Sequence, residues 1–142
     1  MELLKQDAIR SLMSVVFEKA VVSVSGKNWV KFCDGGQVYV SQCKPSSAGK
    51  GKWTYDFFHT IGLATLEKVA TTCKEMVLVN YVDMSYVRLN LEDVSWVLEN
   101  SAREKSNSGK VCDFVVNKSA GDTADLRPLY KSNDQRLQVN VV

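Results

Sequence analysis

Two amides and one amine stand at the polar end of a predicted β-hairpin. The hairpin turns at residues 34–36, Asp-Gly-Gly, between two β-prone runs, and Asp-Gly in that setting is a strong hairpin signal. Because side chains alternate faces along a strand, Gln42 and Lys44 share one face of the second strand. Folding the strands about Gly35 places Asn28, which opens the first strand, across from Gln42, within one residue of register. We therefore expect Asn28, Gln42 and Lys44 to cluster where the apolar face of the hairpin ends.

This cluster has the layout, but not the charges, of a site that hydrolyses phosphodiesters. Such a site clamps Mg²⁺ with carboxylates against the scissile phosphate, and a nearby lysine stabilises charge or helps to activate water. Here the residues at the carboxylate positions, Asn28 and Gln42, are neutral, and an amide binds Mg²⁺ far more weakly than a carboxylate. Asp34 is one source of the missing charge, although it lies in the turn and is expected to be distant from Gln42.

Simpler structural roles also fit these residues. Asp and Gly are the residues that turns require, so residues 34–36 are more simply explained as a turn than as part of a metal site. Gln42 and Lys44 are equally compatible with a strand that leaves the core for solvent.

The elements that must position this cluster follow from the hydrophobic pattern. Apolar residues at helical spacing predict helices over residues 2–19, 61–75 and 90–98. Other β-prone runs predict strands at residues 21–25, 76–82, 85–89 and 111–116. The nearly continuous apolar run 76–82 is typical of a central strand covered on both faces. Asn90, followed by acidic residues, is typical of a helix N-cap.

The rest of the chain is predicted to be mostly loop. Residues 101–110 and 119–125 are polar, and the tail from Arg127 to Val142 has the composition for one further strand. The order of elements predicts an α/β fold, with a mixed β-sheet flanked by helices. At 142 residues, the chain is long enough for one self-sufficient core, so we expect a single domain over residues 1–142.

This layout resembles the PD-(D/E)XK restriction-endonuclease-like superfamily, and it is similar to that of archaeal Holliday-junction resolvases and small restriction enzymes. The resemblance covers roughly residues 2–98. It rests on the first helix, the β-meander, the crossover helix and the strand that follows. It implies a restriction-endonuclease-like fold and a nucleic-acid-processing protein which, if active, is a metal-dependent phosphodiesterase that uses Mg²⁺.

The superfamily motif can be carried over residue by residue. Lys44 matches the motif lysine, Gln42 falls on the Asp/Glu position and Asn28 on the Asp position that opens the first strand. The resemblance thus implies catalytic roles for Lys44 and Gln42 and a metal site at Asn28, Gln42 and Asp34. An acidic residue of the first helix, Asp7 or Glu18, can also contribute. Because two amides stand at the acidic positions, three explanations are open. The protein has a nuclease fold without catalytic activity, or Asp34 supplies the missing negative charge, or the alignment of the hairpin with the motif is shifted.

Basic and aromatic residues after the hairpin suggest contacts to nucleic acid. Lys50 and Lys52 lie in a Gly-rich loop that lacks Walker spacing, and they can contact a phosphate backbone independently of sequence. Trp53 and Tyr55 begin an aromatic patch, interpreted either as core packing or as an exposed platform for a base or a protein. His59, the single histidine, is a candidate general base without a partner at a defined spacing.

Net charge, apolar runs and cysteine content limit the expected cellular location and partners. The net charge of +2 is too small to indicate nucleic acid by itself. No apolar run reaches the roughly 18 residues of a membrane span, and the N-terminus lacks a signal-peptide pattern, so we expect a cytoplasmic protein without a membrane partner. The four scattered cysteines are interpreted as reduced thiols, mostly buried. The alternative function is a non-enzymatic interaction module, such as an immunity or regulatory protein, and a homodimer or another protein partner stays open.

Overall fold

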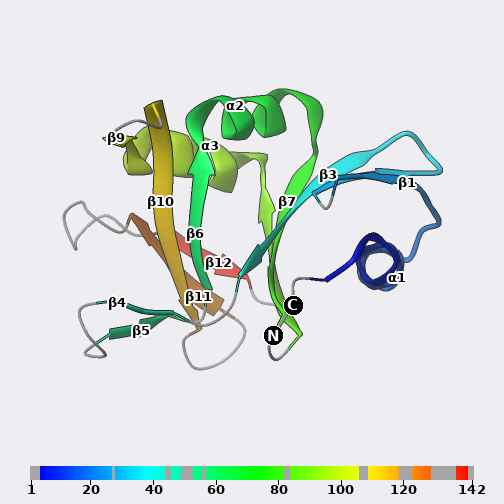
Figure 1. The fold of residues 1–142 in the computed structure, drawn as a ribbon, viewed down its shortest axis with the longest axis horizontal. Helices are drawn as coiled ribbons and strands as arrows, with labels where there is room; N and C mark the ends of the chain where they lie inside the picture. The colour runs from blue at the N-terminus through cyan, green and yellow to red at the C-terminus, as the bar shows by residue number, and fades with distance from the viewer. Residues whose placement is uncertain are drawn as a thin grey trace.

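The structure is a computed structural model that describes residues 4–26, 28–43, 46–48, 53–55, 57–81, 84–105, 109–118, 123–128 and 137–140. Within these residues the chain forms a mixed α/β fold (Figure 1). The helices are α1 (Gln6–Phe17), α2 (Leu63–Thr72) and α3 (Leu91–Ser101). The strands are β1 (Val21–Ser25), β2 (Trp29–Phe32), β3 (Gln37–Cys43), β4 (Ser46–Ala48), β5 (Trp53–Tyr55), β6 (Phe57–Gly62), β7 (Glu75–Asn80), β8 (Ser85–Asn90), β9 (Ala102–Lys105), β10 (Gly109–Lys118), β11 (Thr123–Pro128) and β12 (Leu137–Asn140).

The first sheet has five strands in the order β1-β2-β3-β7-β8. β3 and β7 are parallel, and every other neighbouring pair is antiparallel. Helix α1 covers one face of this sheet, while α2 and α3 lie on the other (Figure 1). The parallel pair needs a crossover connection, and α2 provides the last part of it before β7.

Strand β7 is buried on both faces, as its apolar run predicts. Met76 and Leu78 face the core beneath α2 and α3, whereas Val77 and Val79 face the core beneath α1. All four side chains are 0% exposed. The parallel strand in the middle of a three-layer arrangement therefore has no solvent face, which explains why it is apolar without alternation.

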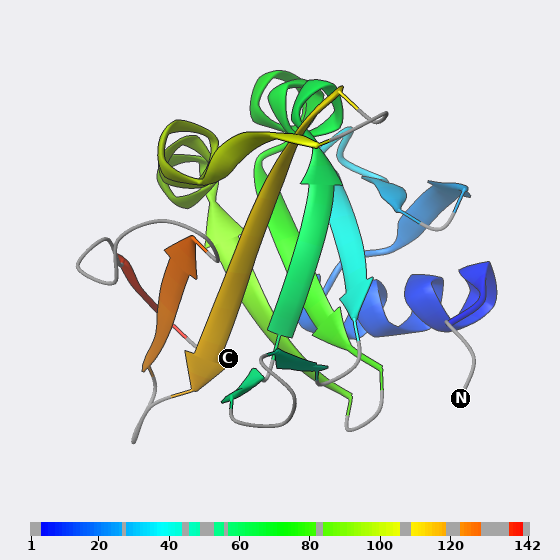
Figure 2. The ribbon, with the colours of Figure 1, turned by 60° about the vertical axis from the view of Figure 1, so that its left-hand side comes forward.

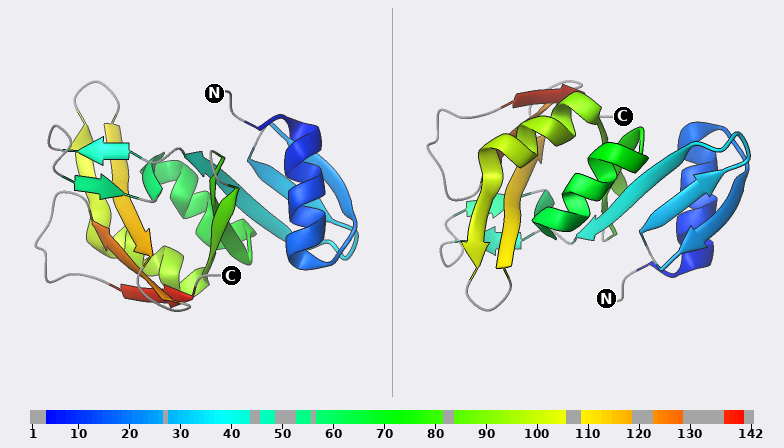
Figure 3. Two further views of the ribbon diagram at one scale, coloured as in Figure 1. Left: turned by 90° about the horizontal axis from the view of Figure 1, so that it is seen from below. Right: turned by 90° about the horizontal axis from the view of Figure 1, so that it is seen from above.

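The second sheet is antiparallel and runs β12-β11-β10-β6, with β9 paired to β10. The long strand β10 lies beside β6 (Figure 2), and β4 and β5 form a separate small hairpin. Views from below and above place α1 with β1 and β2 at one end of the molecule and the second sheet at the other (Figure 3).

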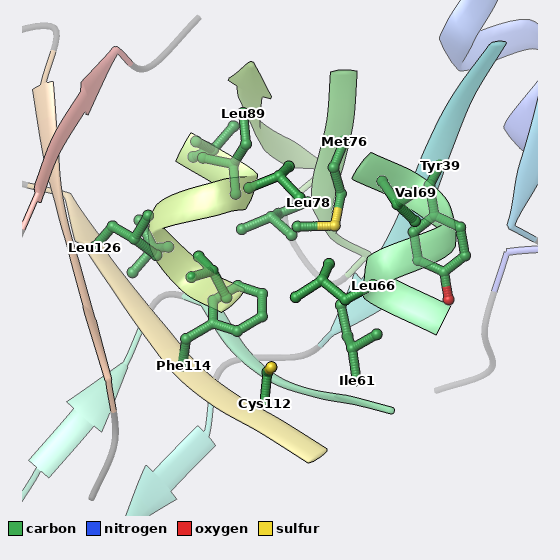
Figure 4. Close-up of a cluster of buried hydrophobic side chains, with 14 of the residues drawn as sticks. Tyr39, Ile61, Leu66, Val69, Met76, Leu78, Leu89, Cys112, Phe114 and Leu126 are labelled. Carbon is green, nitrogen blue, oxygen red and sulfur yellow. The ribbon is translucent and has the colours of Figure 1, made fainter. Parts of the chain in front are cut away.

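One apolar core joins the two sheets. Leu78 and Leu89 come from the first sheet, Phe114 and Leu126 from the second, and Leu66 from α2 (Figure 4). All five side chains are completely buried. The two sheets therefore share this core, while the other face of the first sheet packs against α1 in a separate cluster.

Several predicted elements are confirmed, and the reasons are local. Strand β1 has the predicted bounds, and helix α3 begins at the predicted cap. Asp93 N–H donates to the Asn90 side chain at 2.9 Å, and Asn90 N–H donates back to the Asp93 carboxylate at 3.0 Å. This reciprocal pair is a capping box, which satisfies two backbone donors at the helix start.

Other boundaries differ from the prediction because of pairing between distant segments. The second helix begins at Leu63 rather than at residue 61, since Ile61 and Gly62 belong to β6 and pair with Cys112 and Val111. The prediction of loop at residues 101–110 is wrong over 102–105, which form β9 against β10. The predicted loop at 119–125 is likewise wrong from Thr123, where β11 begins.

None of the described helices combines the length and the apolar character that a membrane-crossing helix requires. Cys73 and Cys112 are free and buried as expected, whereas Cys33 is free but exposed, because it lies in the hairpin turn.

Candidate functional site

The hairpin register differs from the prediction by two residues. Trp29 pairs with Tyr39 and Lys31 with Gln37, so the hairpin folds about Asp34 rather than Gly35. Asn28 consequently lies across from Val40. The Val40 N–H donates to the Asn28 carbonyl at 2.7 Å, and the Asn28 side-chain Nδ2 donates to the Val40 carbonyl at 2.8 Å. The expected pairing of Asn28 with Gln42 is therefore wrong.

Asn28 and Gln42 nevertheless line the same cavity. Strand β2 begins at Trp29, so β3 continues past the end of its neighbour and leaves a gap bordered by β6 and the start of α2. The cavity there has a volume of about 320 Å³, and we call it the β3–α2 pocket. Its lining residues are Asn28, Tyr39, Ser41, Gln42, Thr60, Ile61, Gly62 and Thr65. Among the residues that the structure describes, the lining is rich in amides and hydroxyls and includes no ionised side chain.

Gln42 holds the segment that leads into α1. Its Oε1 accepts a hydrogen bond from the Leu4 N–H at 2.7 Å, and its Nε2 donates to the Leu4 carbonyl at 3.2 Å. These two bonds join residues that are 38 positions apart in the chain. The Gln42 amide therefore connects β3 to the segment that precedes α1. Both its oxygen and its nitrogen take part in these hydrogen bonds.

Replacing Gln42 with methionine is expected to lower the free energy of unfolding by about 1–2 kcal/mol, because it removes two hydrogen bonds from partly buried backbone groups. Amide hydrogen exchange in the first turn of α1 should become faster than in the wild type. Gln37→Met, at the other end of β3, is the matched control. Equal exchange rates in the two variants would contradict the proposed tie.

Asp34 lies at the turn and does not line the β3–α2 pocket. Its Oδ1 accepts from the Gly36 N–H at 2.9 Å, and its Oδ2 forms an ion pair with Lys19 at 2.8 Å. The hydrogen bond with Lys19, followed by that with Gly36, lowers the pKa of Asp34. The turn also needs a positive φ of 86° at Gly35, which glycine adopts without strain. Asp34 thus stabilises the turn, at the opposite end of β3 from Gln42.

The acidic candidates of the first helix also lie outside this pocket. Asp7 lines a separate cavity of about 450 Å³ with Lys5, Gln6 and Gly26. Glu18 is the C-cap of α1, with a left-handed φ of 54°. Within the part of the chain that the structure describes, no group of three or more His, Cys, Asp or Glu side chains could hold a metal ion.

The remaining predicted residues come from the segments around β4 and β5. Lys44, Lys50 and Lys52 lie outside the described residues. Trp53 and Tyr55 are the two ends of β5 and pair with Ala48 and Ser46.

A contact between Ser41 and His59 is the feature that sequence reasoning missed. The Ser41 Oγ and the His59 Nδ1 are 2.7 Å apart, and Ser41 lines the pocket while His59 is only 3% exposed behind it. Burial lowers the pKa of His59 to about 3. An imidazole that is so hard to protonate is a poor general base near neutral pH, so the geometry favours an orienting role for His59 toward the Ser41 hydroxyl.

No sequence signal reveals this contact, because the two residues come from different strands 18 positions apart. His59 also stacks on Phe114, with the ring centroids 5.4 Å apart. The neighbouring Thr60 hydroxyl donates to the Asp113 carboxylate at 2.5 Å. The strand β6 is thus held to β10 directly beside the pocket.

An aromatic pair with one lysine adjoins the pocket through Tyr39. The Trp29 and Tyr39 rings meet edge to face, with centroids 4.8 Å apart. The Lys68 Nζ lies 4.9 Å from the Trp29 ring centroid, which is within the range of a cation–π contact. The sequence pattern does not distinguish Trp29 as a pocket neighbour, because its place in a β-prone run is equally typical of core packing.

Comparisons with models of protein families, with curated proteins and with solved structures find no match for this chain.

Proposed function

We propose that this chain is a restriction-endonuclease-like domain that binds nucleic acid and is catalytically silent. The observation that carries the proposal is the convergence of Asn28, immediately before β2, and Gln42, near the end of β3, on one pocket. These are the two residues that fall on the acidic positions of the superfamily motif.

The arrangement of the first sheet supports the same proposal. Helix α1 precedes a meander of β1, β2 and β3 that lie side by side in chain order, and α2 leads into β7, which is parallel to β3. This is the succession of helix, meander, crossover helix and strand on which the resemblance rests. Strands β4, β5 and β6 are inserted between β3 and α2, and the second sheet is built on that insertion.

The lack of catalytic activity in this proposal follows from the chemistry of the pocket. Mg²⁺ prefers charged oxygen ligands, whereas the pocket offers the neutral amides of Asn28 and Gln42. Gln42 is already bonded at both ends to Leu4. If the protein were active, it would be a Mg²⁺-dependent phosphodiesterase in which Lys44 stabilises the transition state.

The test is an assay of binding and cleavage on labelled single-stranded, double-stranded and branched DNA and on RNA, with Mg²⁺ or Mn²⁺. We expect binding that weakens as salt rises, with no cleavage. Metal-dependent cleavage that is lost in Lys44→Ala would overturn the silent assignment and establish a nuclease. Absence of both binding and cleavage would contradict the whole proposal.

The double substitution Asn28→Asp with Gln42→Glu is expected to create Mg²⁺ affinity at the pocket. Two carboxylates would replace two amides in one cavity. The Gln42→Glu side chain still accepts from the Leu4 N–H but no longer donates to the Leu4 carbonyl, which leaves one carboxylate oxygen free to bind a cation. Charge attraction at short range predicts a gain of at least about tenfold in Mg²⁺ affinity. Calorimetric titration with Mg²⁺ measures it.

The control for this substitution is Gln37→Glu with Asn100→Asp, which adds the same charges away from the pocket. Unaltered Mg²⁺ affinity in the Asn28→Asp, Gln42→Glu protein would rule out the metal-site assignment. An equal gain in the control protein would mean that net charge alone explains the effect.

A second candidate function is a protein-interaction module. Its support is the outer face of α3, where Leu91 is 41% exposed and Trp96 is partly buried. These two residues line a cavity of about 390 Å³ with Glu92, Ser95 and Glu99. If the protein is such a module, we expect it to bind a protein partner at this face and not to bind nucleic acid. The presence or absence of nucleic-acid binding therefore distinguishes the two candidate functions.

A further inference from the structure

The first turn of α2 opens onto the β3–α2 pocket. Its N-cap is Gly62, and no side chain in the described part of the chain caps this end. The first backbone N–H groups of a helix have no partner within the helix, and they carry a partial positive charge. Gly62 and Thr65, from the N-cap and the third helical residue, both line the pocket.

The Tyr39 hydroxyl is a second, independent donor at the same place. Tyr39 is 8% exposed, lines the pocket, and its hydroxyl makes no hydrogen bond with any residue that the structure describes. Figure 4 shows the ring turning its hydroxyl end away from the apolar side chains of the core. The hydroxyl oxygen is not among the buried polar atoms that lack a partner, so it reaches solvent and can donate a hydrogen bond to a ligand in the pocket.

The kind of ligand follows from the charges around the pocket. Lys68 lies on α2 one turn beyond Thr65, and its ammonium is held over the Trp29 ring, which contacts Tyr39 of the pocket lining. Among the described residues, Asp113 carries an opposing charge next to the pocket lining. It is 2% exposed, accepts from the Thr60 hydroxyl, and is not among the residues that line the pocket. Backbone N–H groups at a helix start together with hydroxyl donors form a typical setting for a phosphate.

We propose that the β3–α2 pocket binds a phosphate group through the N–H groups at the start of α2, the Thr65 hydroxyl and the Tyr39 hydroxyl. The inference rests on the proposed function, because it makes this pocket the place where a phosphate of a nucleic acid is held. The same chemistry fits a phosphodiester of the backbone, a terminal phosphate or free inorganic phosphate.

The test follows backbone amide signals by NMR during titration with inorganic phosphate, with chloride at equal ionic strength as the reference. The amides of residues 62–65 are expected to shift selectively with phosphate. Tyr39→Phe and Thr65→Val are each expected to weaken binding by about tenfold, because each removes one hydrogen bond to a charged group. Tyr86→Phe and Thr71→Val are the matched controls, and thermal unfolding verifies that each variant is folded.

Titration with an oligonucleotide that carries a 5′-phosphate, and with the same oligonucleotide without it, separates the sources of the phosphate. Tighter binding of the phosphorylated form identifies a terminal phosphate, and equal binding that depends on Tyr39 and Thr65 identifies the backbone. Shifts at residues 62–65 with inorganic phosphate, together with no binding of either oligonucleotide anywhere on the protein, would support the pocket and overturn the proposed function.

Two results would overturn the inference. One is the absence of selective shifts at residues 62–65, and the other is unchanged phosphate affinity in both Tyr39→Phe and Thr65→Val. If such a protein still bound oligonucleotides in a salt-dependent way, the proposed function would stand while the phosphate pocket would not.

Discussion

Replacing Leu78 with alanine is expected to lower the free energy of unfolding by about 4 kcal/mol. The substitution loses the transfer free energy of the removed atoms, and it also leaves a cavity that a rigid core cannot fill. Leu78 is completely buried on β7. It lies in the core that both sheets share with α2 and α3. The surrounding strands and helices limit collapse around the space that the side chain leaves. Urea-induced unfolding, followed by circular dichroism, measures the change.

Leu91→Ala is the matched control for this substitution. Leu91 begins α3 and is 41% exposed, so its loss is expected to cost less than about 1 kcal/mol. Equal effects of the two substitutions would contradict the described core. A single unfolding transition in both proteins would agree with one domain over residues 1–142, whereas two separate transitions would contradict that prediction.

Acidification from pH 7 to about pH 5 is expected to lower the free energy of unfolding by about 2 kcal/mol through His59 alone. Burial lowers the pKa of His59 in the folded protein to about 3, while the unfolded chain has the ordinary histidine pKa of about 6.5. As the pH falls, the unfolded state binds the proton first and is favoured. The stability is therefore fully present above about pH 6.5 and is lost progressively as the pH falls toward the folded pKa.

The same unfolding series with His59→Gln isolates this contribution. His59 is the single histidine of the chain, and glutamine keeps hydrogen-bonding capacity toward Ser41 without titrating in this range. The pH dependence between pH 7 and about pH 5 should then be flatter by about 2 kcal/mol than in the wild type. An NMR titration of the His59 ring adds a direct readout, and a ring that becomes protonated near pH 6 in the folded protein would show that the prediction is wrong.

Local sequence patterns were sufficient for elements whose structure is determined by near neighbours. The turn at residues 34–36 forms because Asp34 accepts from the Gly36 N–H and Gly35 adopts a positive φ. The capping box at Asn90 uses only Asp93, three residues away. The apolar run of β7 could be assigned to a central strand because burial on both faces removes alternation.

Pairing between distant segments was beyond the reach of those patterns. Residues 102–105 and 123–125 are polar enough to predict loops, yet they form strands because β10 offers them hydrogen bonds. The hairpin register depended on whether the turn centres on Asp34 or Gly35. A shift of the turn centre by one residue changes the pairing by two, so Asn28 faces Val40 rather than Gln42.

For the candidate site, the sequence by itself determined the chemical types: neutral amides at Asn28 and Gln42, a neighbouring lysine at position 44 and a turn at Asp34. Only the tertiary structure decided which side chains share a cavity. In the folded chain, Tyr39, Ser41 and Thr65 line the same pocket as the amides. Asp34 pairs with Lys19 at the hairpin turn, and Gln42 accepts a hydrogen bond from Leu4. The physical reason is that residue type fixes what a group can donate or accept, whereas its partners depend on packing between segments far apart in the chain.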